Sequence, residues 1–348
     1  MENNRFREKK ILIYKQYVDY FKTKRNPEDF GEFLSKLKND FTGLIFYEIE
    51  ADSLGGSGGN PTWGYVYKYF GNEEKEEDKL VGVGEAIYKE YDYDYPYDAY
   101  CENIYSALGK HTLTKARVPK IDVAIPNKSN DPTTISYCIF DSESEEMFEI
   151  KDFLYNKFDN DELREKQDII SIKDILECIK ISIDDDENYK EIEEGVIQVL
   201  ALDSIANNPD RHPNNWSVIR NVETGKYELA IFDNSRSFYH MIQKYDKNNS
   251  KWSPSYVITE ERKRNGLGDL GDKVLKYLSR DYKEYFDRFM LNFMNELPKF
   301  YEDLDEMPYS VDKKNIKKEI DDKLRYIRKL YDVEKEEIHD RKDNGDER

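Results

Sequence analysis

Three consecutive segments constrain the fold of this chain more than any other feature. The segment 189–206 has apolar residues at helical spacing, which predicts a helix with one buried face. The segment 207–216 contains Pro209 and Pro213, so it cannot continue that helix. The segment 216–233 has two β-rich runs around a polar turn, which predicts a hairpin. The hairpin returns the chain to the proline-containing loop, so side chains from both are expected to meet.

Length and charge exclude several classes of protein. The chain has 348 residues, enough for two packed lobes, and a formal net charge of −19. Such acidity is incompatible with broad binding to nucleic-acid phosphates, which needs a basic surface, and it disfavours docking on anionic lipid. We therefore expect neither direct nucleic-acid binding nor membrane association.

Targeting and cysteine patterns indicate a cytoplasmic protein. The N-terminal residues are polar and charged, and no stretch approaches the roughly 20 apolar residues of a membrane span. The 3 cysteines show no C-x-x-C spacing, which argues against a disulfide framework and against a thiolate zinc site.

The order of the predicted elements indicates an α+β fold with two lobes. A helical segment over residues 1–40 precedes a small β-rich lobe over 41–141, which contains a Gly-rich loop. A larger helical lobe follows over 142–335. Residues 336–348 have almost no apolar side chains and are expected to be disordered. A small β-rich lobe followed by a larger helical lobe is typical of two-lobed kinases.

Three polar residues in and after the proline-containing loop fit phosphoryl transfer. Asp210 and Asn215 have the Asp-x-x-x-x-Asn spacing, and Asp233 ends the hairpin. In phosphoryl transfer, one carboxylate orients the attacking hydroxyl, while an amide and a second carboxylate hold Mg²⁺ or Mn²⁺ on the phosphates. The alternative is that all three are turn residues, which Asp and Asn commonly are.

These segments resemble the catalytic and metal-binding segments of HipA-like kinases. The order Asp-Arg-His-x-x-Asn over 210–215 is similar to the CtkA-type branch of that family, which are serine/threonine kinases. The resemblance implies that Asp210 is the catalytic base, that Asn215 and Asp233 bind Mg²⁺, and that ATP is the phosphate donor. It continues more weakly over 136–141, where the family has the strand that leads into the adenine-binding hinge.

A glycine cluster is the candidate phosphate-binding loop. Flexible turns often have the same composition, so the cluster is weak evidence on its own. Its residues are Gly55, Gly56, Ser57, Gly58 and Gly59. In HipA-like kinases a serine of this loop can be autophosphorylated, which inactivates the enzyme. The resemblance therefore implies Ser57 or Ser53 as such a site.

Two lysines are candidates for the phosphate anchor. Lys68 lies on a predicted strand with Val66 and is placed ahead of Lys89, which lies nearer the next helix. Glu102, near the start of that helix, is the expected ion-pair partner of either lysine. A strand lysine that simply extends to solvent is the alternative.

The remaining polar residues of interest have structural interpretations. His212 is expected to be a loop histidine bonded to the backbone rather than a catalytic group. Arg211 is consistent either with neutralising a phosphate or the catalytic carboxylate, or with a structural clamp. The acidic run 184–187 lacks the glycine and alternation of a calcium loop, so we interpret it as a solvated turn.

The sequence as a whole predicts an ATP- and Mg²⁺-dependent Ser/Thr protein kinase. The resemblance also implies a toxin restrained by an antitoxin partner. One alternative is a phosphoinositide or other small-molecule kinase on the same core, although the acidity of the chain counts against a lipid headgroup. Another is a nucleotide-binding pseudokinase that acts as an interaction module, against which the three intact polar residues argue.

Overall fold

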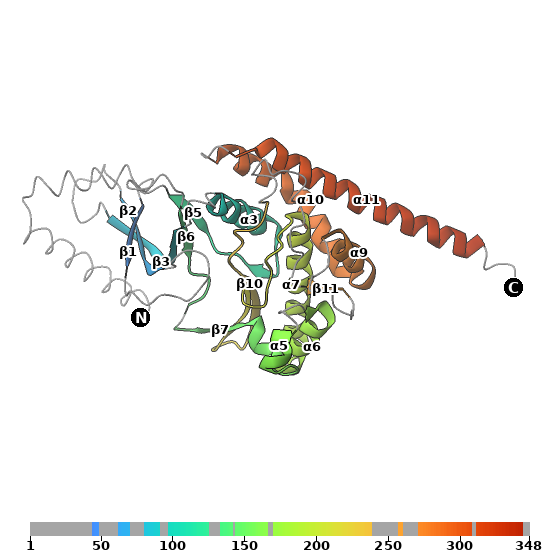
Figure 1. Ribbon diagram of the computed structural model, residues 1–348, viewed down its shortest axis with the longest axis horizontal. Helices are drawn as coiled ribbons and strands as arrows, with labels where there is room; N and C mark the ends of the chain where they lie inside the picture. Colours follow the sequence, from blue (N-terminus) through green and yellow to red (C-terminus); the bar gives the residue numbers. More distant parts are fainter. Residues whose placement is uncertain are drawn as a thin grey trace, which may run out of the picture. The chain divides into compact units, whose positions relative to one another are not determined.

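The computed structural model divides the chain into two compact units (Figure 1). One unit comprises Met1–Pro96 with Asp122–Cys138, and the other comprises Tyr97–Ile121 with Ile139–Arg348. The structure describes residues 44–48, 62–69, 80–90, 97–124, 133–141, 143–165, 170–238, 257–259, 271–307 and 311–343. The predictions for residues 1–40, for Ser53 and for the glycine cluster 55–59 lie outside the described residues.

The smaller unit contains a five-stranded sheet in the order β1-β2-β3-β6-β5. Its strands are β1 (Leu44–Glu48), β2 (Thr62–Tyr69), β3 (Leu80–Glu90), β5 (Ile121–Ala124) and β6 (Thr133–Tyr137). The pairs β1–β2, β2–β3 and β3–β6 are antiparallel. A bulge interrupts the register of β2 and β3 between Val66 and Tyr67. The β-rich runs 44–49, 62–70, 120–125 and 135–140 of the sequence predict four of these strands, and β3 is the one that the sequence misses.

The larger unit contains a four-stranded sheet in the order β4-β10-β9-β7. Its strands are β4 (Ala116–Arg117), β7 (Glu145–Glu149), β9 (Trp216–Asn221) and β10 (Tyr227–Ile231). β9 and β10 form the predicted hairpin, and the chain turns between them at Gly225, whose φ is +67°. Glycine adopts this left-handed conformation at little cost.

Helix α7 (Asp186–Ile205) packs against this sheet and confirms the predicted helix. The apolar residues at helical spacing that predicted it, among them Ile192 and Val196, are buried. Gly195 allows the close approach, because a Cβ atom there would lie 2.4 Å from the carbonyl oxygen of Lys115. The helix thereby delivers its C-terminal end to the proline-containing loop.

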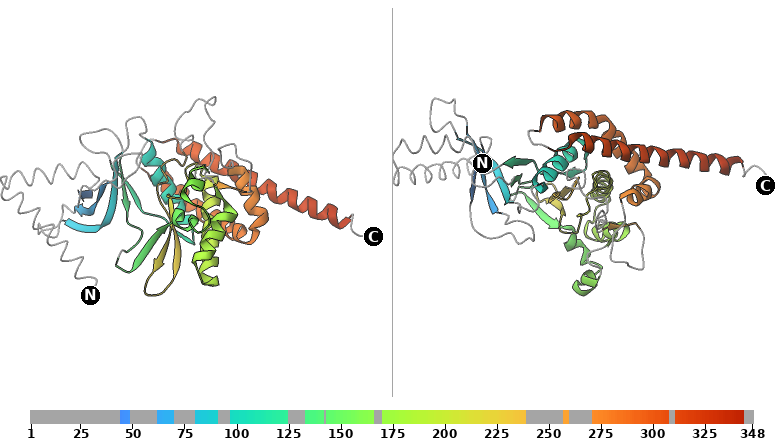
Figure 2. Two further views of the ribbon diagram at one scale, coloured as in Figure 1. Left: turned by 60° about the horizontal axis from the view of Figure 1, so that its bottom comes forward. Right: turned by 45° about the horizontal axis from the view of Figure 1, so that its top comes forward.

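Further helices surround α7 in the larger unit. Helix α3 lies along α10, and both contribute buried side chains to the same core (Figure 2). These helices are α3 (Asp98–Thr112), α4 (Ile150–Leu154), α5 (Asn160–Glu165), α6 (Ile172–Ser182), α9 (Gly271–Asp281), α10 (Lys283–Glu306) and α11 (Lys313–Asp343). A short parallel pair, β8 (Ile170–Ser171) and β11 (Val257–Ile258), completes the described elements.

Two boundaries differ from those predicted. Helix α11 continues to Asp343, so residues 336–343 are helical where the sequence predicted disorder. These residues are rich in Glu, Lys and Arg, which favour a helix even without apolar contacts. Residues 97–121, predicted to belong to the β-rich lobe, belong to the larger unit because α3 packs on α10.

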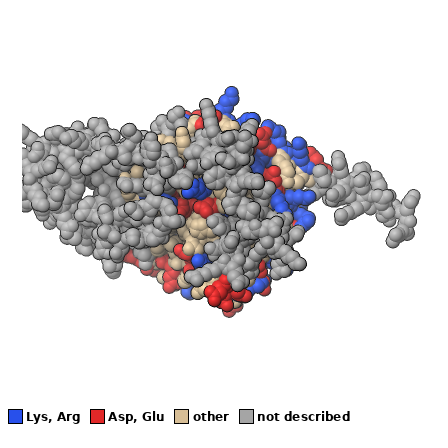
Figure 3. Space-filling view, viewed as in Figure 1, with Lys and Arg blue, Asp and Glu red and all other residues tan. Residues whose placement is uncertain are grey.

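The described surface is rich in carboxylates. In the space-filling view, Asp and Glu gather at the end of the larger unit that carries α5 and α6 (Figure 3). Exposed residues of that end include Asp159, Asp161 and Glu162. No helix in the described part of the chain is both long enough and apolar enough to cross a bilayer.

Candidate active site

The β9–β10 hairpin brings Asn215 and Asp233 together. Trp216 at the start of β9 pairs with Ile231 at the end of β10, so the two polar residues lie just beyond the last paired residues. The N–H group of Phe232 donates to the carbonyl of Asn215 at 3.1 Å, which extends the pairing to the site. Asp233 has a φ of +50°, an uncommon conformation for a residue other than glycine and one that is found at functional sites.

Hydrogen bonds to its backbone N–H and carbonyl groups fix the position of Asp210. Its N–H donates to Oδ1 of Asn208 at 3.1 Å, and its carbonyl accepts from Nδ2 of Asn215 at 2.8 Å. Burial raises the pKa of Asp210 above its ordinary value; His212 opposes this rise, and the nearby carboxylate of Asp233 adds to it. The loop and the end of the hairpin therefore bring Asp210, Asn215 and Asp233 together in one partly buried site.

Arg211 is a buried clamp rather than a ligand for phosphate. Its side chain is 0% exposed and forms an ion pair with Asp203 of α7, with Nε 2.9 Å from Oδ2 and Nη2 3.1 Å from Oδ1. Nη1 donates to the carbonyl of Asn215 at 2.6 Å and to that of Phe232 at 3.3 Å. Nη2 also donates to Oδ1 of Asn234. One side chain thus joins α7, the loop and the end of β10, which decides between the two interpretations from the sequence.

Helix α3 is attached to the same network. The hydroxyl of Tyr105 donates to Oδ1 of Asp203 at 2.6 Å. At the start of the helix, Asp98 lies 3.7 Å from Nη1 of Arg236, three residues after Asp233. Glu102 lies between Asp98 and Tyr105 in α3 and is almost fully buried. The helix that carries Glu102, the expected partner of the lysine, is therefore fixed to α7 and to the segment that follows Asp233.

Two other polar features have structural roles. Nδ1 of His212 accepts from the N–H of Asn214 at 3.2 Å, so this histidine stabilises the loop, as the sequence indicated. The acidic run 184–187 was predicted to be a solvated turn but begins a helix: Asp185 caps α7 by accepting from the N–H of Asn188 at 2.7 Å, and the next two residues lie in its first turn. Acidic residues are favoured in the first turn of a helix because its N-terminus is electropositive.

The register of the small sheet separates the two candidate lysines. Lys68 of β2 lies opposite Val81 of β3, whereas Lys89 of β3 lies opposite Thr134 of β6. The position opposite Lys68 is therefore about 25 Å from Lys89 along β3, so the two lysines lie near opposite ends of the sheet. Lys89 is at the end where β2 begins, since Thr62 pairs with its neighbour, Tyr88. Both lysines belong to the smaller unit and Glu102 to the larger, so their pairing stays a prediction.

The donor set at the loop suits a metal that is held jointly with a nucleotide. The bond from Nδ2 of Asn215 to Asp210 orients the amide, so that its oxygen is the atom left for a cation. Ser235 donates to Oδ1 of Asp233 at 3.2 Å and restrains that carboxylate. Within the described ranges, no three His, Cys, Asp or Glu side chains form a metal-binding group. An amide and one carboxylate fit Mg²⁺, which commonly takes its other ligands from phosphates and water.

Comparison with known proteins identifies the fold. No protein-family model and no curated sequence matches the chain. A solved structure of the proinflammatory kinase CtkA from Helicobacter pylori aligns over 84% of this chain and 96% of that one, with a TM-score of 0.56 and 16% identity. The chain has the CtkA-type kinase fold. A HipA structure from Shewanella oneidensis, in complex with HipB and operator DNA, aligns over 86% of this chain and 72% of that one, with a TM-score of 0.49 and 11% identity.

The CtkA-type fold agrees with the predicted α+β arrangement of a β-rich part and a helical part. The sequence predicted that side chains of the loop and the hairpin meet, and the structure brings them together. It did not predict the attachment of α3, because Asp98 and Tyr105 are only two of several polar residues on that helix.

Proposed function

We propose that this chain is an ATP- and Mg²⁺-dependent protein kinase that phosphorylates serine or threonine. The observation that carries the proposal is the convergence of Asp210, Asn215 and Asp233 at the base of the β9–β10 hairpin in a CtkA-type fold. The net charge of −19 favours a protein hydroxyl over an anionic lipid headgroup as the acceptor.

The loop residues have distinct roles in the proposed reaction. Asp210 orients the acceptor hydroxyl and takes its proton, for which its raised pKa is an advantage. Asn215 and Asp233 hold Mg²⁺, which supplies charge neutralisation on the phosphates when bound. Arg211 keeps these three groups in register without contacting the reactants.

Metal binding is expected to depend on nucleotide. Because only Asn215 and Asp233 supply ligands, Mn²⁺ alone should bind weakly, and ATP should increase the apparent Mn²⁺ affinity by about 10-fold or more. Isothermal titration of Mn²⁺, with and without a non-hydrolysable ATP analogue, measures this. Asp233→Asn should remove the nucleotide-dependent part, whereas Asp312→Asn, at an exposed position before α11, should keep it. Failure of the wild-type protein to bind the analogue would overturn the kinase proposal.

The register favours Lys89 as the phosphate anchor. The connection between β1 and β2 starts after Glu48 and ends before Thr62, at the same end of the sheet as Lys89. Lys89→Met is therefore expected to lower kcat/KM for ATP by about 10-fold or more, the value of a charge-assisted bond to phosphate. Lys68→Met is the matched control and should leave kcat/KM within about twofold. The opposite ranking in steady-state kinetics would contradict this assignment and restore Lys68.

Regulation follows from the same proposal. Ser57 or Ser53 is proposed as a site of inactivating autophosphorylation, and an antitoxin as a regulatory partner. The HipA structure to which the chain was compared contains HipB. For this chain, the antitoxin proposal rests on the resemblance of its loop residues to HipA-like kinases.

A further inference from the structure

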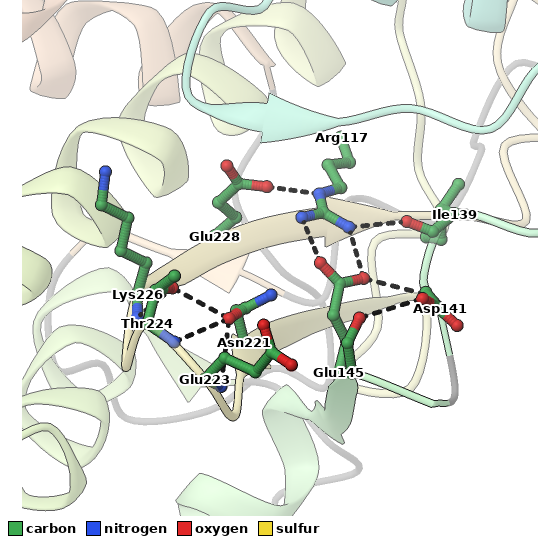
Figure 4. Close-up of polar contacts among 10 residues, drawn as sticks. Arg117, Ile139, Asp141, Glu145, Asn221, Glu223, Thr224, Lys226 and Glu228 are labelled. Atoms are coloured by element: carbon green, nitrogen blue, oxygen red, sulfur yellow. Dashed lines mark hydrogen bonds and ion pairs between the residues drawn. The ribbon is translucent and has the colours of Figure 1, made fainter. Parts of the chain in front are cut away.

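A side-chain cluster around Arg117 lies where the chain passes between the two units. The chain leaves the larger unit after Ile121 and returns to it at Ile139. Arg117, in β4 just before this departure, donates from Nη1 to the carbonyl of Ile139, the first residue after the return, at 2.9 Å (Figure 4). One side chain is therefore close to both connections, on the side of the larger unit.

The geometry around Arg117 is that of a strong ion pair. Nη1 and Nη2 each lie 2.8 Å from a different carboxylate oxygen of Glu145, and Nε donates to Glu228 (Figure 4). Bidentate pairing of arginine with carboxylate is stronger and more directional than an ordinary surface contact. Glu145 is 10% exposed, and the adjacent guanidinium lowers its pKa below the ordinary value.

The pair acts on a backbone that has no regular structure. Residues 138–141 are neither helix nor strand, so no ladder of hydrogen bonds fixes them. Oε2 of Glu145 accepts from the N–H of Asp141 at 2.9 Å, and Arg117 holds the carbonyl of Ile139. Side chains therefore hold both ends of this short connection, together with a turn in which the carbonyl of Asp141 accepts from the N–H groups of Ser144 and Glu145.

We propose that Arg117 and Glu145 are positioning residues that hold residues 139–141 in one conformation and thereby set the affinity of the protein for nucleotide. This inference rests on the proposed kinase function and on the resemblance of residues 136–141 to the strand that leads into the adenine-binding hinge of HipA-like kinases. A connection that is already ordered loses less conformational freedom when nucleotide binds, so binding is tighter. The pair contacts none of Asp210, Asn215 and Asp233 in the described contacts, so the transfer step should be unaffected.

The test compares Glu145→Gln and Arg117→Lys with Glu146→Gln. Glu146 is the next residue on β7 and lies 3.6 Å from Arg220 in an exposed pair, so it is a matched control. We expect the Kd for an ATP analogue to rise about 10-fold in Glu145→Gln and in Arg117→Lys, while kcat stays within about twofold of the wild-type value. Glu146→Gln should leave both the Kd and kcat unchanged. The double variant should be no weaker than the weaker single variant, because either change breaks the same pair.

Hydrogen exchange supplies a readout that needs no nucleotide. In the nucleotide-free protein, the amide of Asp141 should exchange faster in Glu145→Gln than in wild type or Glu146→Gln. Unchanged exchange, or faster exchange with an unchanged Kd, would overturn the inference. A wild-type protein that binds no nucleotide would refute the kinase proposal and, with it, the role of Arg117 and Glu145 in nucleotide affinity. The exchange result would still decide whether this pair orders residues 139–141.

Discussion

Asp210→Asn is expected to lower the rate of phosphotransfer by about 10²–10⁴-fold, the usual contribution of a positioned acid–base group. The backbone bonds that fix Asp210 are unchanged by this substitution, so the loop should keep its conformation. Nucleotide binding should stay close to that of wild type, because the metal ligands Asn215 and Asp233 are intact. ADP formation in the presence of an acceptor protein measures the rate.

The same variant is expected to be more stable than the wild-type protein. The folded-state pKa of Asp210 is raised, so its proton favours the folded state, and stability declines as pH rises through that pKa. Above that pKa the ionised, partly buried carboxylate is unfavourable, and the neutral amide removes this cost. The gain in thermal midpoint of Asp210→Asn over wild type should therefore grow as the pH rises through the pKa of Asp210 and shrink below it. Asp184→Asn, at an exposed position, should change neither rate nor midpoint. A lower midpoint in Asp210→Asn would contradict this explanation.

Arg211→Met is expected to cost about 3–5 kcal/mol of unfolding free energy, because it leaves Asp203 as an unpaired buried charge. It also leaves the carbonyls of Asn215 and Phe232 without this donor, so phosphotransfer should be lost in the fraction that remains folded. Equilibrium unfolding in urea measures the free energy.

A surface pair provides the control for this variant. Arg220 pairs with Glu146 at 3.6 Å and both side chains are largely exposed, at 45% and 49%, so Arg220→Met should cost only about 0–1 kcal/mol. Adding Asp203→Leu to Arg211→Met should recover part of the lost stability, since the buried charge is removed with its partner. Equal costs for Arg211→Met and Arg220→Met would show that Arg211 is not the clamp of the loop.

The loop and hairpin of the site could be predicted because their signals are local. Two prolines exclude helix over 207–216, and the helix and hairpin on either side have clear periodicities. The third strand of the small sheet, β3, could not be predicted in this way. Gly82 and Gly84 interrupt its pattern, and the bulge beside Val66 breaks the alternation of its faces.

The long-range polar contacts of the structure have no local signal in the sequence. Arg117 and Glu145 are separated by 28 residues, and Tyr105 and Asp203 by 98. Such contacts arise only when the fold brings distant segments together. The same is true of the choice between Lys68 and Lys89, because strand register decides which end of the sheet each occupies.

The most direct test of the kinase proposal is the intact mass of the purified protein after incubation with Mg²⁺ and ATP. We predict a phosphate increment in the wild-type protein, mapped by peptide sequencing to Ser57 or Ser53, and none in Asp210→Asn. An increment of equal size in both proteins would show that Asp210 is not the catalytic base. No increment in the wild-type protein and no ADP formed, although the nucleotide binds, would contradict the assignment of this chain as a kinase.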